Sequence, residues 1–202
     1  MINIGVLALQ GSIAEHIHSL SMIEGVSPCE VKSVSDLEKI SGLILPGGES
    51  TTIGKLIKDF GLAEPIIKRA KKGMPIWGTC AGMILMAKEI VNENYVHLGI
   101  MDISVRRNAY GSQLDSFNSI VSIPIVSHED IPLVFIRAPW VETAGEKVRI
   151  LTRVNSRIAA MQQNNMIATS FHPELTTNLA FHKYFTGIVI QHQSALIGRI
   201  HL

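Results

Sequence analysis

Short apolar runs alternate with longer amphipathic stretches through the first half of the chain. Apolar runs bounded by turn residues predict buried strands over residues 3–9, 43–45 and 75–79. Apolar residues at helical spacing predict helices over 12–24, from Ser50 or Thr51 to 60, over 62–72 and over 81–91. This alternation is typical of βαβ units and therefore predicts a parallel sheet.

Ser12 stands at the expected start of the first helix. It lies three residues before Glu15, which is the spacing of a capping box. We therefore expect the Ser12 side chain to cap that helix.

The second half of the chain consists mainly of short strands separated by turn residues. These strands are predicted over 103–107, 120–126, 133–137, 148–152, 158–162 and 166–171, and a final helix over 178–197. We find no internal repeat, low-complexity segment or linker. The sequence predicts one domain over residues 1–202, an α/β three-layer sandwich with a mostly parallel central sheet and a mixed extension in the second half.

Composition narrows the function classes. The 202 residues are 47% hydrophobic and 17% charged, with a net charge of +1 and no long run of like charges, so neither disorder nor nucleic-acid binding is indicated. There is no signal-peptide pattern and no uninterrupted stretch of about 18 apolar residues. We expect a cytoplasmic protein that binds no membrane.

Cys80 lies in the sequence Gly78-Thr79-Cys80-Ala81-Gly82, between a predicted strand and a predicted helix. This is the setting of a nucleophile elbow, and a helix N-terminus stabilises the reactive thiolate. The alternative is a structural cysteine at a glycine-rich turn. Cys29 has no such setting and is interpreted as a core thiol. A disulfide between the two is disfavoured in a reducing compartment, and two isolated cysteines indicate no metal site.

A cysteine nucleophile needs a general base, and His172 is the strongest candidate. It follows the strand predicted over 166–171 and precedes Pro173-Glu174, so in an extended segment the two side chains share one side. The carboxylate can then hold one ring nitrogen while the other faces the thiol. His16 and His18 lie two apart on a helix and face different sides, whereas His182 on the last helix remains open.

Attack on an amide carbonyl creates an oxyanion that needs N–H donors. Ala81, directly after the proposed nucleophile, offers one donor, and the loop over residues 45–50, with Gly47-Gly48 at the end of a strand, offers another. Arg107 and Arg137 end predicted strands and could hold a carboxylate or carbonyl near the site. Ordinary surface salt bridges are the alternative for both arginines.

Taken together, these motifs resemble class I (triad) glutamine amidotransferases, and within them the glutaminase subunits of pyridoxal 5'-phosphate synthase. The resemblance rests on motifs in one order along the chain: Gly5–Gly11, Leu45–Thr52, Gly78–Gly82, Arg107-Asn108 with Tyr110-Gly111 and Asp115-Ser116-Phe117, Phe135–Pro139 and Ser170–Thr176.

The resemblance implies hydrolysis of L-glutamine to glutamate and ammonia through a cysteine thioester. It implies Cys80, His172 and Glu174 as the triad, and an oxyanion hole at Gly48 and Ala81. The substrate contacts that it implies are Gly48, Glu49, Ser50, Arg107, Ile136 and Arg137. Neither a cofactor nor a metal is implied, and ammonia passes to a separate synthase subunit that makes pyridoxal 5'-phosphate.

Three other interpretations stay open at this point. The chain could be the glutaminase subunit of another pathway, such as histidine or tryptophan biosynthesis. It could be a related cysteine hydrolase, although those enzymes place histidine directly after the nucleophile, where this chain has Ala81. It could also be a non-catalytic binding module, against which the intact triad argues.

Overall fold

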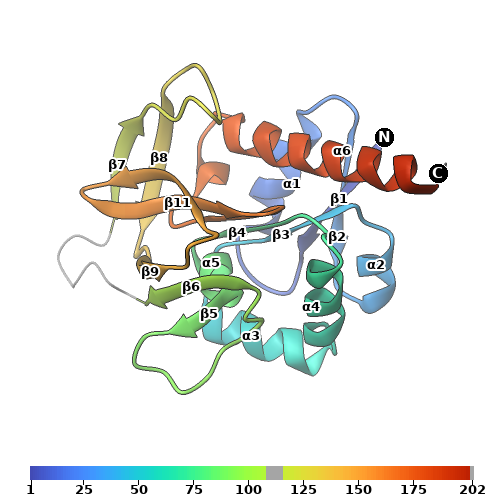
Figure 1. Cartoon of the computed structure of the whole chain (residues 1–202), viewed down its shortest axis with the longest axis horizontal. Coiled ribbons are helices and arrows are strands. Elements are labelled where there is room, and N and C mark those ends of the chain that lie inside the picture. The colour runs from blue at the N-terminus through green and yellow to red at the C-terminus, as the bar shows by residue number, and fades with distance from the viewer. Residues whose placement is uncertain (108–115, 201–202) are drawn as a thin grey trace.

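The computed structural model describes residues 1–107 and 116–200, with the side chains of 199 and 200 excluded. A seven-stranded sheet forms its centre (Figure 1). In spatial order its strands are β10 (Arg149–Val154), β11 (Arg157–Gln163), β12 (Met166–Thr169), β4 (Ile76–Thr79), β3 (Gly42–Leu45), β1 (Ile2–Leu7) and β2 (Val26–Val31). The ladders from β12 to β2 are parallel, whereas β10, β11 and β12 pair antiparallel.

Helices cover both faces of this sheet. One face carries α1 (Ile13–Ser21) and α6 (Ala180–Ile200), and the other carries α2 (Val34–Glu38), α3 (Ser50–Asp59), α4 (Ala63–Lys71) and α5 (Ala81–Met86). Successive side chains along each strand point to opposite faces of the sheet, so each strand packs against both helix layers. On β3, Ile44 packs toward α1 and α6, whereas Leu43 and Leu45 pack toward the other face. The predicted three-layer α/β fold is therefore confirmed.

Two small sheets extend the molecule beside β11 (Figure 1). One contains β5 (Ala87–Ile90), β6 (Met101–Arg106) and β9 (Trp140–Ala144). The other is the antiparallel pair β7 (Ser116–Val121) and β8 (Ile131–Ile136). These sheets and the β10–β11 hairpin form the mixed extension that the second half of the sequence predicts.

Several predicted boundaries are wrong for identifiable reasons. The helix predicted over 81–91 ends at Met86, because residues 87–90 leave it to pair with β6 as β5. The strand predicted over 120–126 ends at Val121, and Pro124 lies in the turn that follows, since proline removes a ladder donor. The first helix ends at Ser21 rather than near residue 24. The sequence pattern did not predict β2, α2, β5 or β9.

The parallel order β12-β4-β3-β1 decides where the site lies. The carboxyl ends of neighbouring parallel strands meet at one edge of a sheet. Cys80 directly follows β4, the Pro46-Gly47-Gly48 loop follows β3, and His172 follows β12. Three segments far apart in the sequence thus converge at this edge.

Candidate active site

Cys80 occupies a tight turn between β4 and α5. Its φ is 47° and its ψ is −103°, a backbone conformation that L-residues rarely adopt, and its side chain is buried. Glycines at positions 78 and 82 make the turn possible. A Cβ on Gly82 would lie 2.0 Å from the Leu45 carbonyl oxygen, and one on Gly78 would lie 2.5 Å from the backbone of Gly82. The geometry is that of a nucleophile elbow.

His172 and Glu174 are in direct contact. The Nδ1 atom of His172 lies 2.8 Å from the Oε1 atom of Glu174, and both residues are buried. The local backbone differs from the expected extended segment, because Pro173–Leu175 forms a 3₁₀ turn, η1. Proline at the first position of this turn fixes its φ, so the pair is held by a turn rather than by strand alternation.

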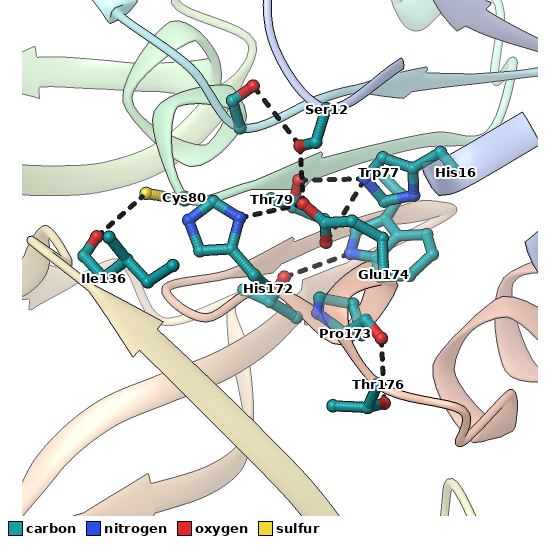
Figure 2. Close-up of polar contacts among 12 residues, drawn as sticks. Ser12, His16, Trp77, Thr79, Cys80, Ile136, His172, Pro173, Glu174 and Thr176 are labelled. Carbon is teal, nitrogen blue, oxygen red and sulfur yellow. Dashed lines mark hydrogen bonds and ion pairs between the residues drawn. The ribbon is translucent and has the colours of Figure 1, made fainter. Parts of the chain in front are cut away.

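Figure 2 shows the His172 ring between the Cys80 sulfur and the Glu174 carboxylate. Burial lowers the pKa of His172, but hydrogen bonds with Cys80 and Glu174 and the negative charges of both groups outweigh it and raise the pKa to about 10. These contacts favour the protonated form of the ring, the form that can act as an acid beside a cysteine nucleophile.

Glu174 has a second partner, Ser12, for which the sequence pattern predicted a role as a helix cap. Ser12 Oγ donates to Glu174 Oε1 at 2.6 Å and makes no capping bond to α1, so the predicted capping box is wrong (Figure 2). The Ser12 hydroxyl is the donor in this bond, and hydrogen bonds to a charged carboxylate are strong, which directs the side chain at Glu174. Burial raises the pKa of Glu174, but His16, His172 and Ser12 together lower it to about 2.

A cavity of about 350 Å³ opens in front of Cys80. The residues that line it include every predicted site residue except Glu174, which lies behind His172: Gly48, Glu49, Ser50, Cys80, Ala81, Arg107, Ile136, Arg137 and His172. Gln10, Ile84 and Pro139 also line it and were not predicted. For Gln10, the sequence did offer a signal, because it directly follows the first strand at the same sheet edge.

The Gly47-Gly48 loop closes one side of this cavity. The carbonyl oxygen of Gly47 accepts the Ser12 N–H at 3.1 Å, so the N–H of Gly48 on the same trans peptide points the opposite way. A Cβ on Gly47 would lie 2.3 Å from His172 Cε1. Glycine at this position therefore lets the loop pack directly on the imidazole.

Charged groups of both signs border the cavity. Arg107 Nη2 lies 3.2 Å from Glu49 Oε1, and its Nη1 donates to the Tyr95 hydroxyl at 3.0 Å. Burial raises the pKa of Glu49, but hydrogen bonds from Thr52 and Thr51 at the start of α3 lower it to about 2. Arg137 directly follows β8 and lines the cavity. Its φ is 42°, a left-handed conformation that is rare for residues other than glycine.

Two buried histidines lie behind the site. His16 on α1 and His182 on α6 contact each other, and His16 also approaches Glu174. His16 does not pair with His18, as expected from their spacing. Ser12 and His16 are four residues apart, which on a helix gives one common face. That spacing indicated that Ser12 and His16 could contact the same group, but nothing in the sequence identified this group as Glu174.

Other predictions are only partly covered by the structure. Asn108, Tyr110, Gly111 and Asp115, which contributed to the family resemblance, lie outside the described residues. Cys29, half-buried in β2, and Cys80 are both free thiols. Residues 1–107 and 116–200 contain no group of three His, Cys, Asp or Glu side chains arranged to hold a metal. Within the same ranges, no helix is both long enough and apolar enough to cross a membrane.

Comparison with known proteins gives a consistent result. The sequence model of the SNO glutamine amidotransferase family matches residues 6–191. A relative from Thermoanaerobacter sp. (strain X514), named pyridoxal 5'-phosphate synthase subunit PdxT, is 59% identical over 182 residues, which cover 90% of this chain and 96% of the relative. A relative of the same name from Ruminiclostridium cellulolyticum is 54% identical over 189 residues, which cover 94% of this chain and 100% of the relative. A crystal structure of a glutamine amidotransferase superposes with a TM-score of 0.87 at 40% identity, covering 92% of this chain and 98% of that one.

Proposed function

We propose that this chain, which belongs to the SNO glutamine amidotransferase family, hydrolyses L-glutamine at the cavity beside Cys80. The ammonia that is released would be used in the synthesis of pyridoxal 5'-phosphate. The arrangement of Cys80, His172 and Glu174 supports this chemistry, because His172 contacts both of the other residues. Cys80 and His172 line a cavity large enough for an amino acid. A family relationship over nearly the whole chain supports the choice of substrate.

In the proposed reaction, the Cys80 thiolate attacks the carboxamide carbon of glutamine. The developing oxyanion accepts hydrogen bonds from the backbone N–H groups of Ala81 and Gly48. The His172 imidazolium gives its Nε2 proton to the nitrogen as the C–N bond breaks, which releases ammonia and leaves a thioester. His172, now neutral, takes a proton from water, and the hydroxide attacks the thioester, which releases glutamate and restores the Cys80 thiolate.

Glu174 holds Nδ1 of His172 throughout this cycle, and its negative charge stabilises the imidazolium. Gln10 and the predicted contacts Gly48, Glu49, Ser50, Arg107, Ile136 and Arg137 bind the amino acid. Arginine and glutamate side chains at one cavity match the two charges of a free amino acid, since its carboxylate and ammonium groups need opposite partners.

We also propose that residues 1–202 form one glutaminase domain and that the ammonia acceptor is a separate synthase subunit. The relatives' names describe a subunit of pyridoxal 5'-phosphate synthase, which supports a partner in trans. Two free thiols fit a reducing compartment, and we place the protein in the cytoplasm on that ground.

The test is glutamate release from L-glutamine by the purified chain alone and after addition of its synthase subunit. We expect release that rises with the synthase and is abolished by Cys80→Ala. Cys29→Ala is the matched control, because Cys29 lies in β2 and not on the cavity, and it should keep wild-type activity.

Two results would contradict the proposal. Activity that survives Cys80→Ala would assign the nucleophile to another residue. An absence of glutamate in every mixture, together with binding of the synthase, would favour a non-catalytic regulatory subunit.

A further inference from the structure

His16 and His182 are fully buried polar side chains that the proposed reaction does not use. They come from α1 and α6, the two helices that cover one face of the sheet, and lie directly behind Glu174. A buried polar group that makes no interaction destabilises a fold. A pair of histidines at this depth therefore needs a physical reason.

The contacts of His16 lead toward the carboxylate. Its Nδ1 lies 3.0 Å from His182 Nε2. Its Nε2 lies 3.2 Å from Thr79 Oγ1 and 3.5 Å from Glu174 Oε2 (Figure 2). Glu174 Oε1 already accepts from Ser12 and His172. Oε2 is buried and has no hydrogen-bond partner among the described residues; the His16 Nε2 atom, which contacts Thr79 Oγ1, lies 3.5 Å from it.

The hydrogen-bond pattern selects one tautomer for each ring, because only one proton fits between His16 Nδ1 and His182 Nε2. If His16 donated, its Nε2 lone pair would face the Glu174 carboxylate, and His182 would keep a buried N–H at Nδ1 with no described partner. If His182 donates, His16 carries its proton on Nε2 and directs it at Thr79 and Glu174. The second arrangement removes the repulsion and leaves only a bare ring nitrogen without a partner, which is less unfavourable than an unpaired N–H.

Burial favours the neutral form of both rings. Burial lowers the pKa of His16, although Glu174 opposes it, and burial together with His16 lowers the pKa of His182 to about 3. The titratable groups that act on the pair are Glu174 and His172 beside it and Glu15 on α1. A neutral donor stabilises the Glu174 carboxylate without competing with the His172 imidazolium for its charge.

We propose that His16 is a positioning residue for the glutaminase reaction, oriented by His182 and directing its Nε2–H at Oε2 of Glu174. This inference rests on the proposed function. A carboxylate fixed at both oxygens cannot rotate, so Oε1 stays on His172 Nδ1 and the imidazole keeps its orientation toward Cys80. Ser12, just before α1, and His16 on α1 thus face the two oxygens of one carboxylate.

The activity test compares His16→Leu, which removes the donor at similar volume, with His16→Gln, whose amide N–H reaches the position of Nε2. Glutamate release is measured with the synthase subunit present. We expect His16→Leu to lower kcat about 10- to 100-fold, the effect of losing a hydrogen bond to a charged group, with KM changed less than about threefold. His16→Gln should recover most of this loss. His18→Leu, the same change on the exposed face of α1, is the control and should have no effect.

The pH profile separates positioning from general damage to the fold. Without the N–H, the Glu174 carboxyl binds a proton more readily, so the acid limb of kcat/KM should move to higher pH in His16→Leu. His182→Leu should lower kcat in the wild-type background but not in His16→Leu, because the two rings act through one contact.

A spectroscopic test needs no variant to be active. In ¹⁵N-histidine-labelled protein, His16 should be neutral with its proton on Nε2 from about pH 6 to pH 8, and its signals are assigned by their loss in His16→Gln. A proton on Nδ1 of His16, or a doubly protonated ring, overturns the inference. So does an active wild type whose kcat and pH profile are unchanged by His16→Leu. A wild type that releases no glutamate with its synthase refutes the proposed function itself, and the role of His16 with it.

Discussion

Glu174 is the residue on which the proposed active site depends most. It is buried, it contacts His172 and Ser12 through one oxygen, and it keeps its negative charge although burial opposes that charge. Its neighbours are neutral or positive donors, which explains how a carboxylate remains ionised in this position. Cys80 and His172 can have the proposed roles only while this charge is held in place.

The low pKa of Glu174 makes a prediction for stability in acid. Its folded-state pKa of about 2 lies below the ordinary 4.5, so its contribution is fully present above pH 4.5 and is lost as pH falls toward 2. Glu174→Gln removes a group that titrates in this window. Urea unfolding from about pH 5 to about pH 3 should therefore show a smaller fall in unfolding free energy for the variant than for wild type. Equal slopes would contradict the ionised, hydrogen-bonded carboxylate.

At this scale the sequence predicts some site residues and misses others for a physical reason. Cys80 and the His172-Pro173-Glu174 segment are short local patterns whose meaning follows from neighbouring residues. The contact of Ser12 with Glu174 spans 162 positions, and that of His16 with His182 spans 166. The local spacing therefore predicted a helix cap at Ser12. Its actual partner, Glu174, comes close only in the folded sheet, where β12 pairs with β4.

At the scale of secondary-structure elements, α5 is packed so closely on β3 that one helical glycine has no room for a side chain. A Cβ on Gly82 would lie 2.0 Å from the carbonyl oxygen of Leu45, which is backbone and cannot easily move. Gly82→Ala should therefore destabilise the protein by about 1–3 kcal/mol, measured by urea unfolding. Gly187→Ala in α6 is the matched control.

At Gly187 nothing lies within 4 Å of an added Cβ, so the control should be neutral or should stabilise by up to about 1 kcal/mol. If both variants have the same unfolding midpoint, α5 and β3 are not in the close contact described above.

The segment between β5 and β6 contributes to the proposed substrate contacts through Tyr95. Its hydroxyl accepts from Arg107, which also faces Glu49 across the cavity edge. Tyr95→Phe removes this contact, and we expect KM for glutamine to rise about 3- to 10-fold with kcat changed less than about twofold.

Tyr184→Phe is the control for this change, because that hydroxyl donates to Gln162 and does not line the cavity. A fall in kcat at unchanged KM in Tyr95→Phe would instead assign Arg107 to the chemical step.

The sequence predicts most strands and helices, but it misses β2, α2 and β5 in the first half and β9 in the second. Alternating apolar runs with helices between them give β1, β3 and β4 nearly at their observed positions. Residues 87–90 continue the helical spacing of α5, and only their pairing with β6 makes them a strand. β2 was missed because Pro28, Cys29 and Glu30 interrupt its apolar pattern at a sheet edge.

At the scale of the whole molecule, the cavity opens where four parallel strands end, and ammonia formed there has to reach an acceptor. Ammonia released to solvent at neutral pH is mostly protonated and is a poor nucleophile. We therefore expect direct transfer to the synthase subunit. With amide-¹⁵N glutamine and an excess of unlabelled ammonium, the product of the synthase should carry ¹⁵N with little dilution, measured by mass spectrometry.

Dilution of the label to the isotope ratio of the bulk ammonium would contradict direct transfer. Free ammonium as the sole nitrogen source, at the same concentration, shows how much product forms without the glutaminase and serves as the control.

Covalent trapping tests most directly whether Cys80 attacks glutamine. The chain with its synthase subunit is treated with an electrophilic glutamine analogue, and the modified peptide is identified by mass spectrometry. We predict one adduct, on Cys80, that L-glutamine suppresses and that His172→Ala slows strongly. Modification of Cys29 instead, or of Cys80 at a rate that neither glutamine nor His172→Ala changes, would contradict a glutaminase site at this edge of the sheet.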